Sequence, residues 1–307
     1  MSYSSSFQKI ILAIFHSCRF FPILIVLSFI FGSCILENLD DCAEYNLTVR
    51  IVDEKGEDLP KRTLNSLNAY LFDSTGFVRE VSMLHDNNLF FGYNISDKLT
   101  VVAWGNLRVD SLLLPSLTPG VSLDSASIKL RKEGVYDLTS TDLFYTRYMR
   151  NHSNSLRSGS MPEDTITLTL SRKAAMVSID AYHIGKHFSG DTTNLHFEVR
   201  GTLNALNFMG EPAGESAVYE PKASYTASGS FSTGMFRVLP VSDNGRIYVD
   251  IYRGEQLVYT ASTDSKGEVL RAVSGMHLNV SITFDFATVL VTCAITPWGE
   301  EKQETTF

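Results

Sequence analysis

The chain is poor in proline and cysteine, with nine and four in 307 residues, and its twenty glycines are an ordinary share. This composition excludes a collagen-like or linker-dominated chain, and no fixed-period repeat or low-complexity block is present. Basic residues number 26 against 34 acidic ones, giving a formal charge of −8. Because phosphate repels such a chain and no local basic patch offsets the charge, we expect no nucleic-acid partner.

Complete catalytic motifs are also missing. The sequence contains no HExxH metal helix and no GxSxG nucleophile elbow. Gly229 and Gly234 have the separation of a phosphate-binding loop, but Met235 stands where the lysine is needed. We therefore interpret both glycines as turn residues and expect no enzymatic activity, no catalytic residues and no cofactor.

His183, His187 and His196 form the sole histidine cluster. The spacing of the first two would serve a metal ion only in a helix, and Gly185 together with a preceding strand argues against one. We therefore predict no metal site.

The N-terminus carries the clearest targeting signal. Residues 20–31 are almost entirely apolar, basic Lys9 and Arg19 precede them, and no acidic residue occurs before Glu37. A membrane-spanning helix needs about 20 apolar residues, whereas this run is shorter and contains Pro22. The pattern predicts a secretory signal peptide over residues 1–33. An uncleaved anchor is the alternative.

Residues 31–34 read Phe-Gly-Ser-Cys and resemble the bacterial lipobox. The resemblance implies cleavage between Ser33 and Cys34 and acylation of Cys34, which would tether the mature chain to a membrane without spanning it. Residues 34–45 then form an acidic tether. Such leaders resemble the signal that exports lipoproteins of Bacteroidota to the outer face of the outer membrane.

Two cysteines remain beyond the lipobox, Cys42 beside the tether and Cys293 in a C-terminal apolar segment. They allow one disulfide, which would tie the tether to the last strand. The alternative is a free, buried Cys293 and an exposed Cys42, and the sequence leaves both open.

Beyond residue 45 the dominant hydrophobic period is two, which predicts an all-β chain. The clearest strand covers 276–286, and 246–253 with 257–262 form a predicted hairpin. Further strands are predicted at 47–52, 67–72, 77–82, 99–104, 165–170 and 288–298, and residues 172–179 are expected to open a second unit. Residues 140–150 are predicted to form a short helix.

The length after the signal favours two β-sandwiches over one, since domains commonly contain about 100 to 150 residues. We place an N-terminal sandwich at 46–171 and a C-terminal sandwich at 172–307, with the boundary near Ser171. Residues 147–162 are basic and polar, and they are predicted to form an exposed excursion near the end of the first unit.

Five short phrases follow the lipobox in a fixed order. They are LDDC at 39–42, AYLFDSTG at 69–76, TVVAWGN at 100–106, LSRKAAMV at 170–177 and ITPW at 295–298. Together they resemble the minor-fimbrium anchoring lipoproteins of Bacteroidales, over nearly the whole mature chain. The resemblance implies two tandem transthyretin-like β-sandwiches, no enzymatic activity, and a position at the base of a fimbrium. There the protein would attach the fibre to the outer membrane and limit its length.

Physical reasoning agrees with this role. Exposed sheet edges can accept an extended segment of a fimbrial subunit through backbone hydrogen bonds, although residues 288–298 are also typical of a buried closing strand. Structural pilins of the kind this chain resembles are cut after an arginine near the N-terminus. Arg50 and Arg62 are available, but an anchor must keep its lipidated end, so we expect no cleavage there.

Two rival functions remain. An extracellular glycan-binding lipoprotein would use exposed aromatic side chains such as Tyr145, Tyr219, Tyr225 and Trp298. A hydrolase would need two converging carboxylates in a cleft, whereas the carboxylates of this chain are dispersed through turns. Coplanar rings on one exposed face would favour the glycan binder.

Overall fold

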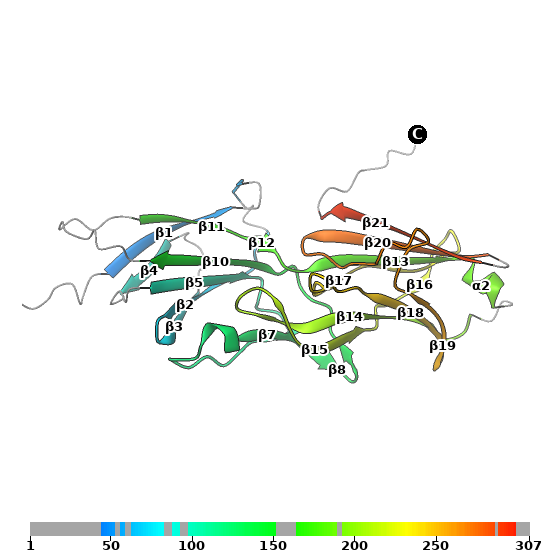
Figure 1. Ribbon diagram of the computed structural model, residues 1–307, viewed down its shortest axis with the longest axis horizontal. Helices are drawn as coiled ribbons and strands as arrows, with labels where there is room; N and C mark the ends of the chain where they lie inside the picture. The colour runs from blue at the N-terminus through cyan, green and yellow to red at the C-terminus, as the bar shows by residue number, and fades with distance from the viewer. Residues whose placement is uncertain are drawn as a thin grey trace, which may run out of the picture. The chain divides into compact units, whose positions relative to one another are not determined.

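The computed structural model describes residues 44–52, 56–58, 63–82, 88–92, 98–151, 164–188, 192–285 and 288–298. Strands dominate these residues (Figure 1), and the two helical segments are a 3-10 turn at Leu123–Ser125 and a single turn, α2, at Ile184–His187. The all-β class predicted from the sequence is therefore confirmed. No described helix has the length and apolar character needed to cross a membrane.

The strands up to residue 172 are mostly short. They are β1 (Glu44–Val52), β2 (Leu67–Asp73), β3 (Gly76–Ser82), β4 (Asn88–Gly92), β5 (Lys98–Gly105), β6 (Leu112–Leu113), β7 (Ser127–Leu130), β8 (Lys132–Glu133), β9 (Tyr136–Asp137), β10 (Phe144–Asn151), β11 (Asp164–Thr169) and β12 (Ser171–Arg172).

The strands after residue 172 include the longest one. They are β13 (Ala175–Tyr182), β14 (Leu195–Asn207), β15 (Pro212–Tyr219), β16 (Ser224–Tyr225), β17 (Phe231–Val238), β18 (Tyr248–Arg253), β19 (Gln256–Ala261), β20 (Met276–Phe284) and β21 (Val289–Pro297).

Most of these strands belong to four sheets. Their strand orders are β11-β1-β4, β12-β10-β5-β2-β3, β16-β17-β13-β20-β21 and β19-β18-β14-β7-β6, and β15 pairs with β14 beside the last path. β8 and β9 form a separate two-stranded hairpin. Among the pairs with a described register, two are parallel, β1 with β11 and β13 with β20. The architecture is that of a β-sandwich protein.

Alternation of apolar and polar residues predicted the strands well. In β20 the residues Leu278, Val280, Ile282 and Phe284 are buried and alternate with partly exposed neighbours. The predicted hairpin is β18–β19, and Gly254 in its turn has a φ of 58°, a left-handed conformation that suits glycine. Its register is interrupted by a bulge between Ile251 and Tyr252.

Two predictions around residue 150 were wrong. The expected helix at 140–150 is instead occupied from Phe144 by β10, which pairs with β5 over eight positions and with β12. Long-range pairing decides this segment, and its aromatic residues suit a pleated surface. The predicted excursion at 147–162 is also strand as far as Asn151, while 152–163 lie outside the described residues.

The core runs through both halves of the sequence. Phe208, which follows β14, lies 4.9 Å from the Tyr70 ring and 6.1 Å from the Trp104 ring, and Tyr145 donates a hydrogen bond to its carbonyl oxygen at 3.0 Å. One hydrophobic cluster includes these side chains together with most of the buried apolar residues of β13, β14, β18 and β20. Residues from both sides of Ser171 therefore share a packed interior.

The chain divides into a small unit, residues 1–45 with 91–94, and a large one, residues 46–90 with 95–307. Of the small unit, only residues 44–45 and 91–92 are described. Within the large unit, β7 pairs with β14, so strands from both sides of Ser171 share one sheet. The division into sandwiches at 46–171 and 172–307 stays a prediction.

Candidate functional site

β21 is an edge strand of its sheet, with β20 as its sole neighbour among the described strands. Figure 1 shows it in red beside β20. Its first half alternates between covered and exposed residues, whereas 294–297 are exposed throughout. Two large apolar side chains on it are open to solvent, Leu290 at 50% and Ile295 at 42%. Long edges of this kind are templates for strand addition.

The loop before β20 caps the first half of β21. The Val291 N–H donates to the Ser265 hydroxyl oxygen at 2.9 Å, and the Ser265 N–H donates to the Val291 carbonyl at 2.8 Å. The loop is held in place by Asp264, whose carboxylate accepts the N–H groups of Lys266 and Glu268, each at 2.9 Å. Ser265 therefore occupies the edge where another strand would otherwise pair.

This cap also reveals which backbone groups of β21 point outward. Since Val291 directs its N–H and carbonyl to Ser265, it cannot be hydrogen-bonded to its partner Ile282 on β20. Antiparallel pairs alternate between bonded and non-bonded, so Cys293 and Ile295 also direct their backbone groups to the open edge. We call residues 293–297 the open segment of β21.

Trp298 fixes the end of the open segment. Its N–H donates to the Gly275 carbonyl at 3.0 Å, and two guanidinium groups contact its ring. The Arg172 carbon Cζ is 4.9 Å from the ring centre and that of Arg237 is 5.2 Å away. Such contacts contribute about 0.5 to 2 kcal/mol each, so the strand end is anchored to β12 and β17.

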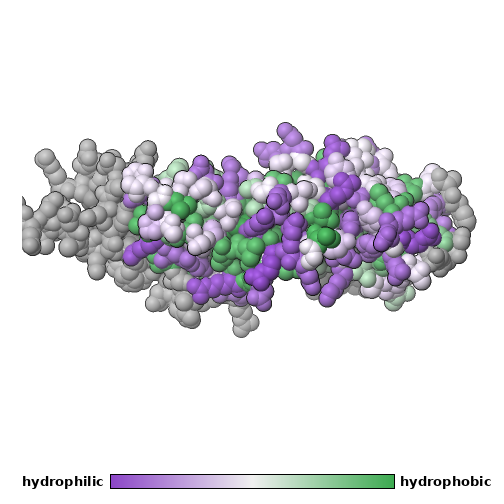
Figure 2. Space-filling view, turned by 90° about the horizontal axis from the view of Figure 1, so that it is seen from below, coloured by the Kyte–Doolittle hydropathy of each residue, from purple (hydrophilic) through white to green (hydrophobic). Residues whose placement is uncertain are grey.

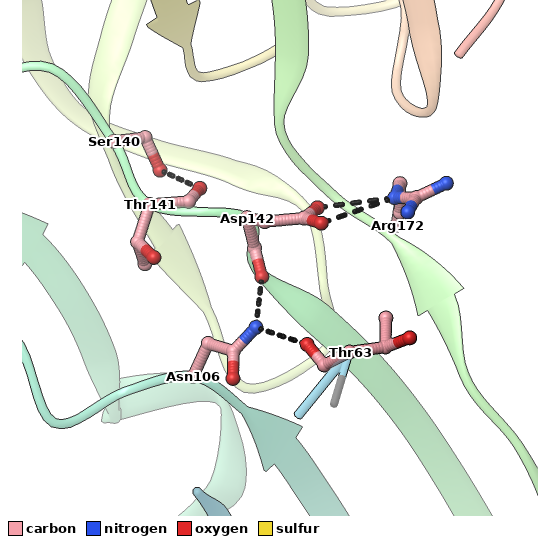
Figure 3. Close-up of polar contacts among 6 residues, drawn as sticks. All are labelled: Thr63, Asn106, Ser140, Thr141, Asp142 and Arg172. Atoms are coloured by element: carbon pink, nitrogen blue, oxygen red, sulfur yellow. Dashed lines mark hydrogen bonds and ion pairs between the residues drawn. The ribbon is translucent and has the colours of Figure 1, made fainter. Parts of the chain in front are cut away.

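Figure 3 shows the polar network that holds Arg172. Its Nε donates to both carboxylate oxygens of Asp142, at 3.1 and 3.3 Å. The Asp142 carbonyl accepts Nδ2 of Asn106 at 2.8 Å, and the same amide donates to the Thr63 carbonyl at 3.1 Å. The network thereby connects Asn106, in the loop after β5, with Arg172, which contacts Trp298 at the end of β21.

Burial dominates the electrostatics of this ion pair. The pKa of Asp142 is raised above its usual value because desolvation outweighs the attraction of Arg172 and of Arg237. Burial at a distance from bulk water penalises the charged carboxylate. The pair therefore serves more to position Arg172 than to stabilise the fold.

Cys293 lies within the open segment with a half-buried side chain. Its Sγ is 3.9 Å from the Asp264 carboxylate, and burial together with that carboxylate raises the thiol pKa. Cys42 lies outside the described residues, so the Cys42–Cys293 disulfide stays a prediction. Ser33 and Cys34, the predicted cleavage and lipidation residues, also lie outside them.

The histidine cluster is dispersed in the structure. His183 precedes α2 in a left-handed conformation with φ 60°, and His187 packs on Phe188 and Phe284 with ring separations of 5.0 and 5.1 Å. The sequence argument against a helix here was wrong, because residues 184–187 form one turn. Across the described residues no three His, Cys, Asp or Glu side chains are grouped as metal ligands would be.

The aromatic residues proposed for glycan stacking divide into two groups. Tyr145 and Tyr219 are buried, so their prediction as exposed platforms was wrong. The reason is packing, since Tyr145 contacts Trp104 at 4.6 Å and the Tyr219 hydroxyl accepts the Leu239 N–H at 3.2 Å. Trp298 is half-buried and in contact with Arg172 and Arg237, and Tyr225 is 44% exposed.

Exposed apolar side chains elsewhere do not form a competing site. They are spread over several elements, including Leu113 and Leu114 near β6, Val135 in the β8–β9 turn and Leu257 on β19. On the face drawn in Figure 2, hydrophobic surface is separated by hydrophilic side chains. Singly exposed apolar residues of this kind are normal.

The sequence analysis missed the Ser265 cap and the Trp298 contacts. The segment 264–267, Asp-Ser-Lys-Gly, was recognised as a turn, but nothing in it identifies Val291 as a partner. The same holds for Arg172 and Arg237, which lie 126 and 61 positions before Trp298 (298 − 172 and 298 − 237).

Comparison with known families gives one extended match. The family model of Mfa2, described as fimbrillin-A associated anchor proteins Mfa1 and Mfa2, matches residues 39–304. A curated relative is the major fimbrium anchoring subunit FimB of Porphyromonas gingivalis, which is 24% identical over 300 residues, covering 92% of this chain and 95% of FimB.

Solved structures show the same fold. The fimbrial anchor protein Mfa2 from Porphyromonas gingivalis superposes with a TM-score of 0.65 at 14% identity, covering 83% of this chain and 98% of Mfa2. An adhesin candidate from Bacteroides ovatus gives 0.61 at 15% identity, covering 85% and 96% of the two chains.

Proposed function

The chain belongs to the family of fimbrillin-A associated anchor proteins, and on this basis we propose that it anchors or initiates a fimbrium by binding a fimbrial subunit at the outer membrane. Its role is associated with fimbriae, and the family is one of anchors and adhesins. We propose further that it acts without enzymatic chemistry.

The membrane end of this proposal rests on Cys34. The signal over residues 1–33 ends at a lipobox-like sequence, and acylation of Cys34 would hold the chain at the membrane surface. The acidic residues of 34–45 support export to the outer face. Retention of an uncut Arg50 also fits, since Arg50 lies inside β1 and pairs with Thr167 of β11.

The subunit-binding end is assigned to the open segment of β21. An extended segment of a fimbrial subunit could pair with the outward backbone groups of Cys293 and Ile295 and cover the Ile295 side chain. The Ser265 cap would stop such pairing at Val291, which sets its register. Trp298, held by Arg172 and Arg237, would keep the edge straight for the partner.

The observation that carries the proposal is the family match over residues 39–304, because it includes β21 and residues 39–45 of the tether. The test is deletion of the protein, with electron microscopy of fibres on cells and in the supernatant. We expect cell-bound fibres to be lost and free fibres to increase. Unchanged cell-bound fibres would remove the anchor role. Re-expression of the full chain is the control that should restore attachment.

A biochemical test addresses the partner directly. The full chain, purified from native outer membranes by an affinity tag, should retain fimbrial subunits through detergent extraction. Recovery of the chain without any fimbrial subunit, from cells that carry fibres, would contradict subunit binding.

A further inference from the structure

A second surface of the molecule carries an organised set of aromatic and polar side chains. On β14 and β18 three pairs lie directly opposite one another, and they are His196 with Tyr252, Glu198 with Asp250, and Arg200 with Tyr248. The residues between them, Phe197, Val199, Val249 and Ile251, are fully buried. Since side chains alternate along a strand, the six paired residues share the opposite side of the sheet. We call them the β14–β18 face.

The rings on this face are arranged by stacking. The His196 and Tyr252 rings lie 5.3 Å apart with an interplanar angle of 8°. At the other end of the face, the Arg200 guanidinium lies 4.3 Å from the centre of the Tyr248 ring. Both tyrosines are half-buried, so each ring is held by its neighbour while part of it stays open to solvent.

The polar groups between the rings are fixed by hydrogen bonds. Arg200 Nε donates to Asp250 Oδ2 at 2.6 Å, and the Thr260 hydroxyl donates to Asp250 Oδ1 at 2.6 Å. The Tyr136 hydroxyl, from β9, donates to Glu198 Oε1 at 2.7 Å. This bond is the main reason that the pKa of Tyr136 is raised to about 12.

We propose that the β14–β18 face binds a neutral oligosaccharide. Sugars present apolar C–H faces that pack on aromatic rings, and hydroxyl groups that exchange hydrogen bonds with carboxylates and guanidinium groups. Tyr252 and Tyr248 supply the platforms, while Glu198 and Arg200 supply an acceptor and a donor between them. Because these side chains are already held by their neighbours, little conformational entropy is lost when a ligand binds.

Charge identifies the class of sugar. Two carboxylates, Glu198 and Asp250, lie on the face, and Arg200 pairs with Asp250. A third carboxylate, Glu220, acts electrostatically on Tyr136. Arg200 offsets Asp250, so the six residues keep one net negative charge, that of Glu198, which repels anionic ligands. Glycans that carry uronic or sialic acids are therefore disfavoured, and uncharged sugar chains are the partners that fit.

The inference is independent of fimbrial anchoring. β14 and β18 belong to a different sheet from β21, and none of the six residues contacts Ser265 or Trp298 by the hydrogen bonds and ring contacts described above. Glycan binding, which the sequence left open as a rival function, is thus a second activity on a separate surface. It would let a fimbrial anchor also hold extracellular polysaccharide.

Saturation-transfer NMR provides the test, with the full chain in a detergent that carries no sugar headgroup. The probes are linear hexasaccharides of β-1,4-glucose, α-1,4-glucose, β-1,4-xylose and β-1,4-N-acetylglucosamine, with oligogalacturonate as the acidic probe. We expect transfer to at least one neutral probe and none to oligogalacturonate. Absence of transfer to every neutral probe, or stronger transfer to the acidic one, would overturn the proposal.

Variants locate the site. Tyr252→Ala should weaken binding of the responding probe about two- to tenfold, which is the effect of losing about 0.5 to 1.5 kcal/mol of ring packing. Tyr252→Phe keeps the ring and should bind as the native chain does. Tyr182→Ala removes an exposed tyrosine on another strand, β13, and is the matched control.

Thermal unfolding of each variant separates loss of the site from loss of the fold. If Tyr252→Ala is folded and binds as tightly as Tyr182→Ala, the β14–β18 face is not the site. If Tyr252→Ala does not fold, Glu198→Gln tests the same face, since it keeps the shape of the side chain and should still weaken binding.

Discussion

Asn106 shows how one residue can organise loops that are distant in sequence. It is 3% exposed and adopts a left-handed φ of 63°, a conformation that asparagine tolerates better than most residues. Its side chain accepts the Asn65 N–H at 2.6 Å and donates to the carbonyls of Thr63 and Asp142. Without this amide, Asp142, which binds Arg172, would lose one of the hydrogen bonds that hold its backbone in place.

Two substitutions separate the contributions of Asn106. Asn106→Gly keeps the left-handed backbone and removes three hydrogen bonds, so we expect a loss of about 2 to 3 kcal/mol in the free energy of unfolding. Asn106→Ala should cost about 1 kcal/mol more, because alanine disfavours this φ. Denaturant unfolding measures both. Equal losses in the two variants would show that the backbone conformation contributes nothing.

Asp142 provides a prediction about pH. Its pKa is raised in the folded chain, so the native state binds the proton more tightly than the unfolded state does. The stability that it contributes is therefore fully present below the unfolded pKa and is lost as pH rises through the folded pKa. The free energies of unfolding of the native chain and of Asp142→Asn should be compared from about pH 3 to about pH 7. We expect the native chain to lose stability relative to the variant as pH rises. A native chain that gains stability relative to Asp142→Asn as pH rises would contradict this prediction.

The contacts and burial of these single side chains could not be predicted from the sequence. Asn106 stood in a recognised phrase, TVVAWGN, yet its three partners lie 41, 43 and 36 positions away. Burial of Tyr145 and Tyr219 was not predictable either, because tyrosine occurs on both the buried and the exposed faces of strands. Burial of one side chain depends on which strand packs across from it.

Among the elements, β21 carries the functional argument. In its open segment the Ile295 N–H points away from β20, whereas the N–H of Ala294, paired with Asn279, points toward it. A proline at 295 would thus remove an edge donor without breaking the ladder, which edge strands tolerate. Proline at 294 should therefore disrupt the ladder with β20, whereas proline at 295 should leave it intact.

Ile295→Pro should abolish or strongly reduce recovery of fimbrial subunits in the tag purification, while leaving thermal unfolding close to native. Ile295→Ala is the matched control, since it shortens the same side chain but keeps the N–H, and it should retain more of the partner. Ala294→Pro should instead destabilise the fold, because proline would remove a hydrogen bond of the ladder with β20. If Ile295→Pro recovers as much subunit as Ile295→Ala, backbone pairing at this edge is not the mode of binding.

Strands with a clear period of two were predictable, and short or irregular ones were not. β20, β18 and β19 were expected within about two residues of their ends. β7 and β6, with four and two residues, were not expected, although they complete the sheet of β14. The parallel pairing of β1 with β11 joins residues 117 positions apart (164 − 47), beyond the reach of local patterns.

For the whole molecule, the predicted lipid separates attachment to the membrane from attachment to the fibre. Cys34→Ser should release the mature chain from the membrane, provided that the signal is still cut. Fibres should then assemble but appear in the medium. Labelling with an alkyne fatty acid, cell fractionation and fibre counts measure the three effects. Continued membrane retention of a cleaved Cys34→Ser chain would contradict lipid anchoring.

Limited proteolysis examines the proposed sandwiches. We expect cleavage within the polar residues 152–163, because such composition concentrates nicking. The two fragments should nevertheless co-elute in gel filtration, since β7 pairs with β14 and the aromatic core joins Phe208 to Tyr70. Fragments that separate without denaturant would show two sandwiches that are stable independently of each other.

The parallel pairing of β1 with β11 has a mechanical consequence. If Cys34 is held in the membrane, any pull on the fibre reaches the described strands at Glu44, where β1 begins. Where the pull is directed along the strand, six consecutive residue pairs from Leu47–Asp164 to Val52–Thr169 oppose it. The hydrogen bonds of this ladder share the load together in shear, rather than opening one after another from an end. The strand next to the tether is thus built to resist tension.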